Sequence, residues 1–290
     1  MNTQAALPIA LAPPGALPNI AAIARRELRD ALRSRWFLLY AIVFVALGLG
    51  ISYISSLSAG VSGLAGFGRT TAGLINLVLL VAPLMALSAG AGSIASDRER
   101  GMLAYLLAQP VARCEVLLGK YLGLAAALAA CICLGLGLCA AILAARGAGA
   151  SPVALLRLAG LSITLALAML SLGLLISTIA RKASIATGIA IFVWLVLVFV
   201  TDLGLMAATV AMRLRIEQLF AISLLNPLQV YKMWSLHASE TSIDVLGSAG
   251  LYAVEEYGPN LHLIFAAALG AWIPLPLALA AWIFSRRSAV

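Results

Sequence analysis

Four charged residues stand side by side in a chain that otherwise carries few of them. Residues 96–121 read SDRERGMLAYLLAQPVARCEVLLGKY, and the charges are Asp97, Arg98, Glu99 and Arg100. The helix dipole favours acids at a helix start, so Ser96 or Asp97 could cap a helix that begins near Arg98. A generic amphipathic loop would not need so ordered a layout, although a purely structural loop remains an alternative.

An apolar ridge of helical spacing follows these charges, formed by Met102, Leu103, Leu106 and Leu107. Pro110 ends this helix, because the residue before a proline is driven out of the helical conformation. A second short helix is expected from about Arg113 into the next apolar stretch. The sequence therefore predicts a helical hairpin over residues 95–120, with a charged tip and an apolar flank.

The amino-acid composition indicates whether most of this chain is surrounded by water or by lipid. Of its 290 residues, 63% are hydrophobic and 10% are charged, whereas a soluble domain is usually about 25% charged. So few charges cannot cover a surface in water, and the lipid bilayer is the expected environment. The net charge of +8 requires no nucleic acid, since arginines beside anionic lipid account for it.

Uncharged apolar stretches of about 20 residues are long enough to cross a bilayer as helices. The sequence contains six, at 36–57, 71–94, 121–143, 153–179, 183–206 and 261–284. We therefore predict an all-α integral membrane protein with six transmembrane helices in a domain over residues 36–290. Lys and Arg are concentrated in the loops that share a side with both termini, and the positive-inside rule places that side in the cytoplasm.

The residues before the first span form a separate element. Residues 19–35 read NIAAIARRELRDALRSR, which gives an apolar face and a basic face at helical spacing. We expect an amphipathic helix on the inner leaflet, capped by Asn19, with a flexible tail over residues 1–18. The tail has no basic region and several prolines, so it does not resemble a secretory signal.

The stretch D-R-E-R-G-M-L-x-x-L-L-A-Q-P-V-x-R-x-E-V-L-L-G-K resembles the cytoplasmic coupling loop of ABC-2-type transporter permeases. Met102 stands where that family usually has threonine. The resemblance implies a homodimer in the bacterial inner membrane, in which each copy seats its loop in a separate cytoplasmic ATPase. The coupling residues that it implies are Asp97, Arg98, Glu99, Arg100, Gly101, Leu103, Leu106, Leu107, Pro110 and Arg113.

This reading requires the ATPase to be another chain. A phosphate-binding loop needs G-x-x-x-x-G-K followed by Ser or Thr. Here Tyr121 follows Gly119-Lys120, and Cys114 occupies the position of the first glycine. We expect no enzymatic activity and no cofactor in this chain, with Mg-ATP bound by the partner.

A long connection over residues 207–259 joins the last two predicted spans on the outer side. Its strings LLNPLQVYKM and SIDVLGSAGLY resemble one branch of the family, which serves copper-site assembly in nitrous oxide reductase. That resemblance implies a periplasmic β-helical copper-binding partner. The expected docking residues are Asn226, Pro227, Gln229, Tyr231, Lys232, Trp234, Tyr252 and Tyr257. A segment that only packs on the bundle is the alternative.

Other functions are less well supported by the residues. Met233 and His237 share a helix face and are weak candidates for a metal site, because thioether and imidazole groups suit copper. A secondary transporter would bury several charged groups near the midplane, and the predicted spans hold mainly Ala, Leu, Gly and Ser. Export of a hydrophobic or lipid-like substrate remains an alternative to mechanical remodelling of a periplasmic partner.

Overall fold

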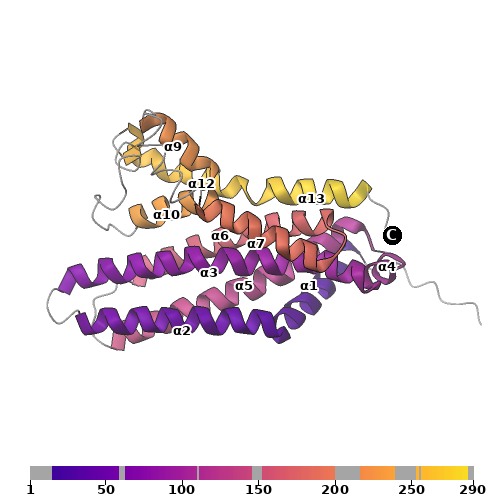
Figure 1. Cartoon of the computed structure of the whole chain (residues 1–290), viewed down its shortest axis with the longest axis horizontal. Helices are drawn as coiled ribbons and strands as arrows, with labels where there is room; N and C mark the ends of the chain where they lie inside the picture. Colours follow the sequence, from indigo (N-terminus) through magenta and orange to yellow (C-terminus); the bar gives the residue numbers. More distant parts are fainter. Residues whose placement is uncertain are drawn as a thin grey trace, which may run out of the picture.

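The protein is represented by a computed structural model, which describes residues 15–58, 63–109, 111–145, 152–199, 216–238, 253–254 and 256–286. Every regular element within these residues is a helix. The long helices run side by side along the longest axis of the molecule (Figure 1). The elements are α1 (Ala16–Arg33), α2 (Arg35–Ser58), α3 (Gly63–Glu99), α4 (Met102–Leu107), α5 (Arg113–Ala145), α6 (Pro152–Ile179), α7 (Ala183–Phe199), α9 (Ile216–Leu225), α10 (Pro227–Ala238), the 3-10 turn η3 (Gly258–Asn260), α12 (Leu261–Ala271) and α13 (Pro274–Arg286).

Four stretches of the described chain are long and apolar enough to cross a membrane, namely Thr71–Glu99, Arg113–Ala145, Pro152–Ile179 and Leu261–Arg286. Counting the bent pair of α1 and α2 as a span gives five, and α7 is a shorter apolar helix of 17 residues. The prediction of an all-helical membrane protein is confirmed. The predicted spans at 36–57 and 183–206 correspond to α2 and α7, and the total of six stays a prediction.

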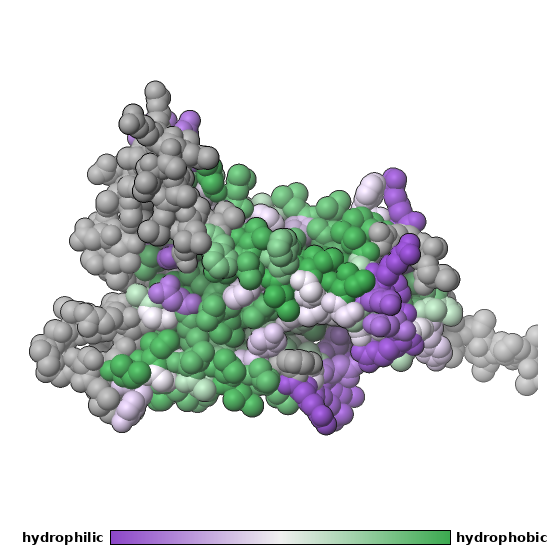
Figure 2. Space-filling view, viewed as in Figure 1, coloured by the Kyte–Doolittle hydropathy of each residue, from purple (hydrophilic) through white to green (hydrophobic). Residues whose placement is uncertain are grey.

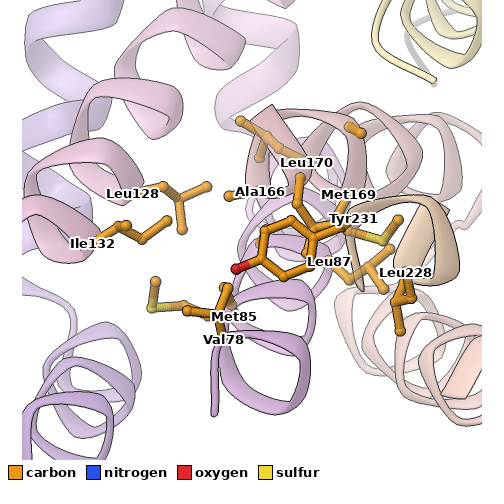
Figure 3. Packing of buried hydrophobic residues seen from close by; sticks show 14 of the residues in the cluster. Val78, Met85, Leu87, Leu128, Ile132, Ala166, Met169, Leu170, Leu228 and Tyr231 are labelled. Carbon is orange, nitrogen blue, oxygen red and sulfur yellow. The ribbon is translucent and has the colours of Figure 1, made fainter. Parts of the chain in front are cut away.

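The core forms where α3 crosses α6 at two glycines. A Cβ atom at Gly90 would lie 2.8 Å from the carbonyl oxygen of Leu170, and one at Gly173 would lie 2.6 Å from that of Leu87. Such small residues let two apolar helices approach closely, which stabilises their packing by van der Waals contact. Side chains of α3, α5 and α6 fill the centre beside this crossing, as Figure 3 shows for Val78, Met85, Leu128, Met169 and others.

The amphipathic helix begins earlier than expected and packs on protein. α1 starts at Ala16, so Asn19 lies within the helix, and its prediction as the N-cap is wrong. Gly119 and Gly123 of α5 leave room for α1, since a Cβ atom at Gly123 would lie 2.5 Å from the carbonyl oxygen of Ala24. The apolar face of α1 therefore contacts α5, and α1 meets the following helix at 63°.

The boundary between α3 and the hairpin also differs from expectation. α3 continues through the charged residues to Glu99, so a helix start near Arg98 is wrong. The chain turns at Gly101, whose φ of 71° lies in the left-handed region that glycine adopts without strain. α4 then spans only Met102–Leu107, and α5 begins at Arg113 as predicted. Pro110 lies outside the described residues.

The last predicted span is divided into two helices. α12 ends at Ala271 and α13 begins at Pro274, with Trp272 and Ile273 between them. Proline is favoured in the first turn of a helix because its missing N–H would have no partner there. The two helices together still form an apolar stretch of 26 residues, Leu261–Arg286.

Polar and apolar residues separate along the molecule. Figure 2 shows hydrophilic side chains gathered at the end that holds α1 and α4, beside an apolar middle. We refer to that end as the α4 end. α9 and α10 lie toward the opposite end (Figure 1), where α10 packs against α3, α6 and α12.

Candidate functional site

The first predicted coupling residue, Asp97, forms a buried cluster of charges. Its Oδ2 lies 2.7 Å from Nζ of Lys120, which also pairs with Oε1 of Glu27. Lys120 is only 1% exposed, and the three residues come from α3, α5 and α1. We call them the Lys120 triad. An ammonium group this far from water requires such acidic partners, because an unpaired buried charge is strongly destabilising.

The next two charged residues bind the ends of neighbouring helices. Arg98 donates to the carbonyl oxygens of Ala180, at 2.5 Å, and Thr178, at 3.5 Å, where α6 ends. Oε2 of Glu99 accepts a hydrogen bond of 3.1 Å from the N–H of Ala183, the first residue of α7. A cation at a helix C-terminus and an acid at an N-terminus are both favoured by the helix dipole.

The far side of the hairpin is held in the same way. Nη1 of Arg113 donates to the carbonyl oxygens of Phe284 and Ser285 near the end of α13, at 3.0 and 3.1 Å. Oε2 of Glu115 accepts hydrogen bonds from the backbone N–H of Ala112 and from the side chain of Asn19 on α1. Residues 97–115 thus contact the ends of α1, α6, α7 and α13.

The tip of the hairpin is the accessible part. Arg100, Gly101, Met102 and Tyr105 are exposed, and Tyr105 is 66% exposed. Leu103 is buried, while Leu106 and Leu107 are half-buried, so three of the four residues of the predicted apolar ridge face the bundle and Met102 does not. The arrangement gives a small exposed surface on α4, flanked by charged residues that are bonded to α1, α6, α7 and α13. A force on α4 would therefore reach most of the bundle.

The predicted outer docking residues are divided between core and surface. Asn226, Pro227 and Tyr231 are buried, whereas Gln229, Lys232 and Trp234 are half-buried and Tyr257 is exposed. Tyr252 lies outside the described residues. The buried members in this structure hold α10 in place, so a docking role for them stays a prediction that would require α10 to move.

Two hydrogen-bond patterns explain why α10 is fixed. Asn226 accepts from the N–H of Leu228 at 3.0 Å and donates to the carbonyl oxygen of Leu197 at 2.8 Å, which caps α10 and joins it to α7. The Tyr231 hydroxyl lies 2.9 Å from the Ser162 hydroxyl on α6. Figure 3 shows the Tyr231 ring among apolar side chains of the core. Pro227 occupies the first position of α10, where its missing N–H costs no hydrogen bond.

The weak metal candidates do not form a larger ligand group. Met233 is buried, and the ring of His237 lies 4.8 Å from that of His262 between centroids. No group of three or more His, Cys, Asp or Glu within the described chain is arranged to hold a metal. Nε1 of Trp234 donates to Nδ1 of His262 at 3.1 Å, which places the proton of a neutral His262 on Nε2 and leaves neither nitrogen free for a metal.

Sequence reasoning missed the residues that complete the α4 end, chiefly Glu27 and Lys120. One signal was present, because Glu27 falls on the apolar face of α1, three and four residues after Ala24 and Ile23. An acid in that position needs a buried partner. The Gly119-x-x-x-Gly123 spacing beside Lys120 was a second signal, since small residues one turn apart admit a neighbouring helix.

Comparison with known proteins identifies the class. A family model described as "ABC-2 family transporter protein" matches residues 21–289. The chain therefore belongs to the ABC-2 family of transporter permeases, as its helices and its charged hairpin indicate. It is 32% identical over 277 residues to a protein named "Probable ABC transporter permease protein NosY" from Pseudomonas aeruginosa, covering 93% of this chain and 99% of that protein. A protein of the same name from Stutzerimonas stutzeri is 33% identical over 274 residues, covering 91% and 97%.

Proposed function

We propose that this chain is the NosY-like permease subunit of an ABC transporter that acts in copper-site assembly of nitrous oxide reductase. Its partners would be a cytoplasmic ABC ATPase (NosF-like), a periplasmic β-helical copper-binding protein (NosD-like) and a second copy of the chain. The ATPase would bind Mg-ATP, and its closure would push the α4 hairpin. Both termini would lie in the cytoplasm and α9 and α10 on the periplasmic side of the bacterial inner membrane.

The observation that carries this proposal is that the hairpin has two parts, one bonded to other helices and one exposed. The charges of Asp97, Arg98, Glu99 and Arg113 are bonded to other helices, while Tyr105 and its neighbours remain exposed. An exposed aromatic side chain on a firmly held helix suits an anchor in a partner's pocket. The bonded charges suit the transfer of motion from that anchor into the bundle.

The packed centre of the described bundle favours mechanical transmission over passage through a single chain. Val78, Leu87 and Met169 have no exposed surface, and they lie on α3 and α6. Interiors packed in this way transmit displacement because they have few voids in which it could be absorbed. Remodelling of a periplasmic partner is therefore the action that we favour.

A pair of tyrosines at opposite ends of the molecule tests the assignment. Tyr105→Ala should weaken binding of the ATPase about tenfold or more, as expected for an aromatic anchor, and leave the periplasmic partner bound. Tyr257→Ala should leave ATPase binding unchanged, because Tyr257 stacks on Phe220 at the other end of the molecule. Affinities measured on the purified permease in nanodiscs would decide. Equal ATPase affinity for wild type and Tyr105→Ala would contradict the proposal.

A further inference from the structure

The Lys120 triad connects three helices through one ammonium group. Nζ of Lys120 contacts Glu27, lies 2.7 Å from Asp97 and donates to the carbonyl oxygen of Ser93 at 3.5 Å. The side chains of Glu27 and Asp97 are 17% and 14% exposed. All three charges are therefore largely shielded from water, and each relies on the others for compensation.

Because the triad is buried, its ion pairs are either formed or broken, with no favourable intermediate separation. Charges taken out of water are tolerated only while paired and hydrogen-bonded, and separating them leaves an uncompensated charge in an apolar site. Small displacements of Asp97 are therefore resisted, and Lys120 and Glu27 are carried along with it. This differs from an exposed ion pair such as Arg26 and Asp30, at 3.6 Å, which water can replace at little cost.

Through Glu27, the triad links α1 to the α4 hairpin. Asp97 stands four residues before the turn at Gly101, so it moves with the α4 hairpin. Glu27 lies on α1, which meets the next helix at 63° with only Ser34 between them. α1 also packs on Gly119 and Gly123 of α5 by van der Waals contact, and Asn19 near its start donates a hydrogen bond of 3.0 Å to Glu115. Neither of these contacts involves Asp97, which the triad joins to α1.

We propose that Lys120 is a positioning residue that makes α1, and through it α2, move together with the α4 hairpin. The ammonium group binds Asp97 at the base of the hairpin and Glu27 on α1, so a push on α4 rotates α1 with α3 and α5. Without the triad, the push still reaches α6 and α7 through Arg98 and Glu99, whereas α1 loses its link to Asp97 and keeps only contacts with α5 that do not involve the base of the hairpin. This inference rests on the proposed function, because it requires an ATPase that displaces the hairpin.

Two acids on α1 provide the test and its control. Glu27→Leu removes the bond to α1 and leaves Lys120 paired with Asp97. Asp30→Leu, one turn away, removes an exposed acid that faces Arg26. In the full complex with its ATPase in nanodiscs, both variants should bind the ATPase as wild type does. Stimulation of ATP hydrolysis by the permease should fall about fivefold or more for Glu27→Leu only.

A distance measurement separates coupling from general loosening. One spin label is placed at Leu263 on α12 as the reference, and the second is placed at an exposed position, either Arg29 on α1 or Arg181 beside α7. The exposed Cys114 and Cys133 are replaced by serine so that they are not labelled. In wild type, ATP should change both distances. In Glu27→Leu, the change at Arg29 should disappear while the change at Arg181 persists.

Each outcome decides the proposal. An ATP-dependent change at Arg29 that survives in Glu27→Leu would overturn the role of Lys120 and leave the proposed function intact. No change at either position in wild type would overturn both. If Glu27→Leu does not fold, the triple variant Glu27→Gln, Asp97→Asn, Lys120→Met removes all three charges together and avoids an unpaired one. It should show the same selective loss at Arg29, and a retained change there would refute the proposal.

Discussion

The close approach of α3 and α6 depends on the absence of side-chain atoms at Gly90 and Gly173. The atoms that a Cβ would meet there belong to the backbone of the opposite helix, namely Leu170 and Leu87. A backbone carbonyl cannot move aside as a flexible side chain does. The whole crossing would therefore have to widen to admit one methyl group.

Two glycines in α3 allow this cost to be measured. Gly90→Ala should lower the free energy of unfolding by about 1–3 kcal/mol, the usual effect of overpacking a core. Gly92→Ala should be neutral or stabilising, because nothing lies within 4 Å of a Cβ there and alanine is the better helix former. Thermal unfolding of the two variants in the same detergent gives the comparison. Equal losses would show that the crossing is not close-packed.

At the scale of the element, the contact between α10 and α12 contains two histidines. The Trp234 indole on α10 can only donate a hydrogen bond, so it needs an unprotonated Nδ1 on His262. Burial and, to a smaller extent, the nearby His262 lower the pKa of His237 below its ordinary value. The folded contact therefore favours the neutral form of His237.

Acid should consequently release α10 from α12. A lowered pKa of His237 in the folded state adds stability above the ordinary value of 6.5. That stability is lost as the pH falls through the lowered pKa. The protection factors of the α10 amides, which allow for the intrinsic slowing of exchange in acid, should fall between about pH 7.5 and pH 5, and His237→Phe should reduce this fall. An exchange rate in α10 that follows only the intrinsic pH dependence of amides would contradict this.

The sequence predicted most elements but not how their ends are joined. Span positions follow from the length of uncharged stretches, so α5 and α6 were located closely. The predicted second span ends at residue 94, where the uncharged stretch ends, whereas α3 continues through the charged residues to Glu99. Their actual partners, such as Lys120 and Ala180, are distant in sequence, and only the packing of three helices brings them together.

At the scale of the whole molecule, charge and exposure define two different ends. The α4 end carries the polar band of Figure 2, whereas α9 and α10 lie toward the other end. The positive-inside rule predicts that the α4 end faces the cytoplasm. The exposed thiol of Cys114, at the start of α5, is a native reporter of that side.

Thiol labelling in intact cells tests this orientation. In a Cys133→Ser background, a membrane-impermeant maleimide should modify Cys114 only in inverted vesicles, since the reagent cannot cross the bilayer. Tyr257→Cys should be modified from outside in the same background. Labelling of Cys114 in intact cells would reverse the predicted topology.

The burial of α10 has a consequence for biogenesis. Its 12 residues extend about 18 Å at 1.5 Å per residue, which is shorter than the hydrocarbon layer of about 30 Å. We therefore do not expect the translocon to insert α10 across the bilayer as an independent segment. The Tyr231 hydroxyl pairs with Ser162 on α6, so α10 would take its place only once α6 is in position.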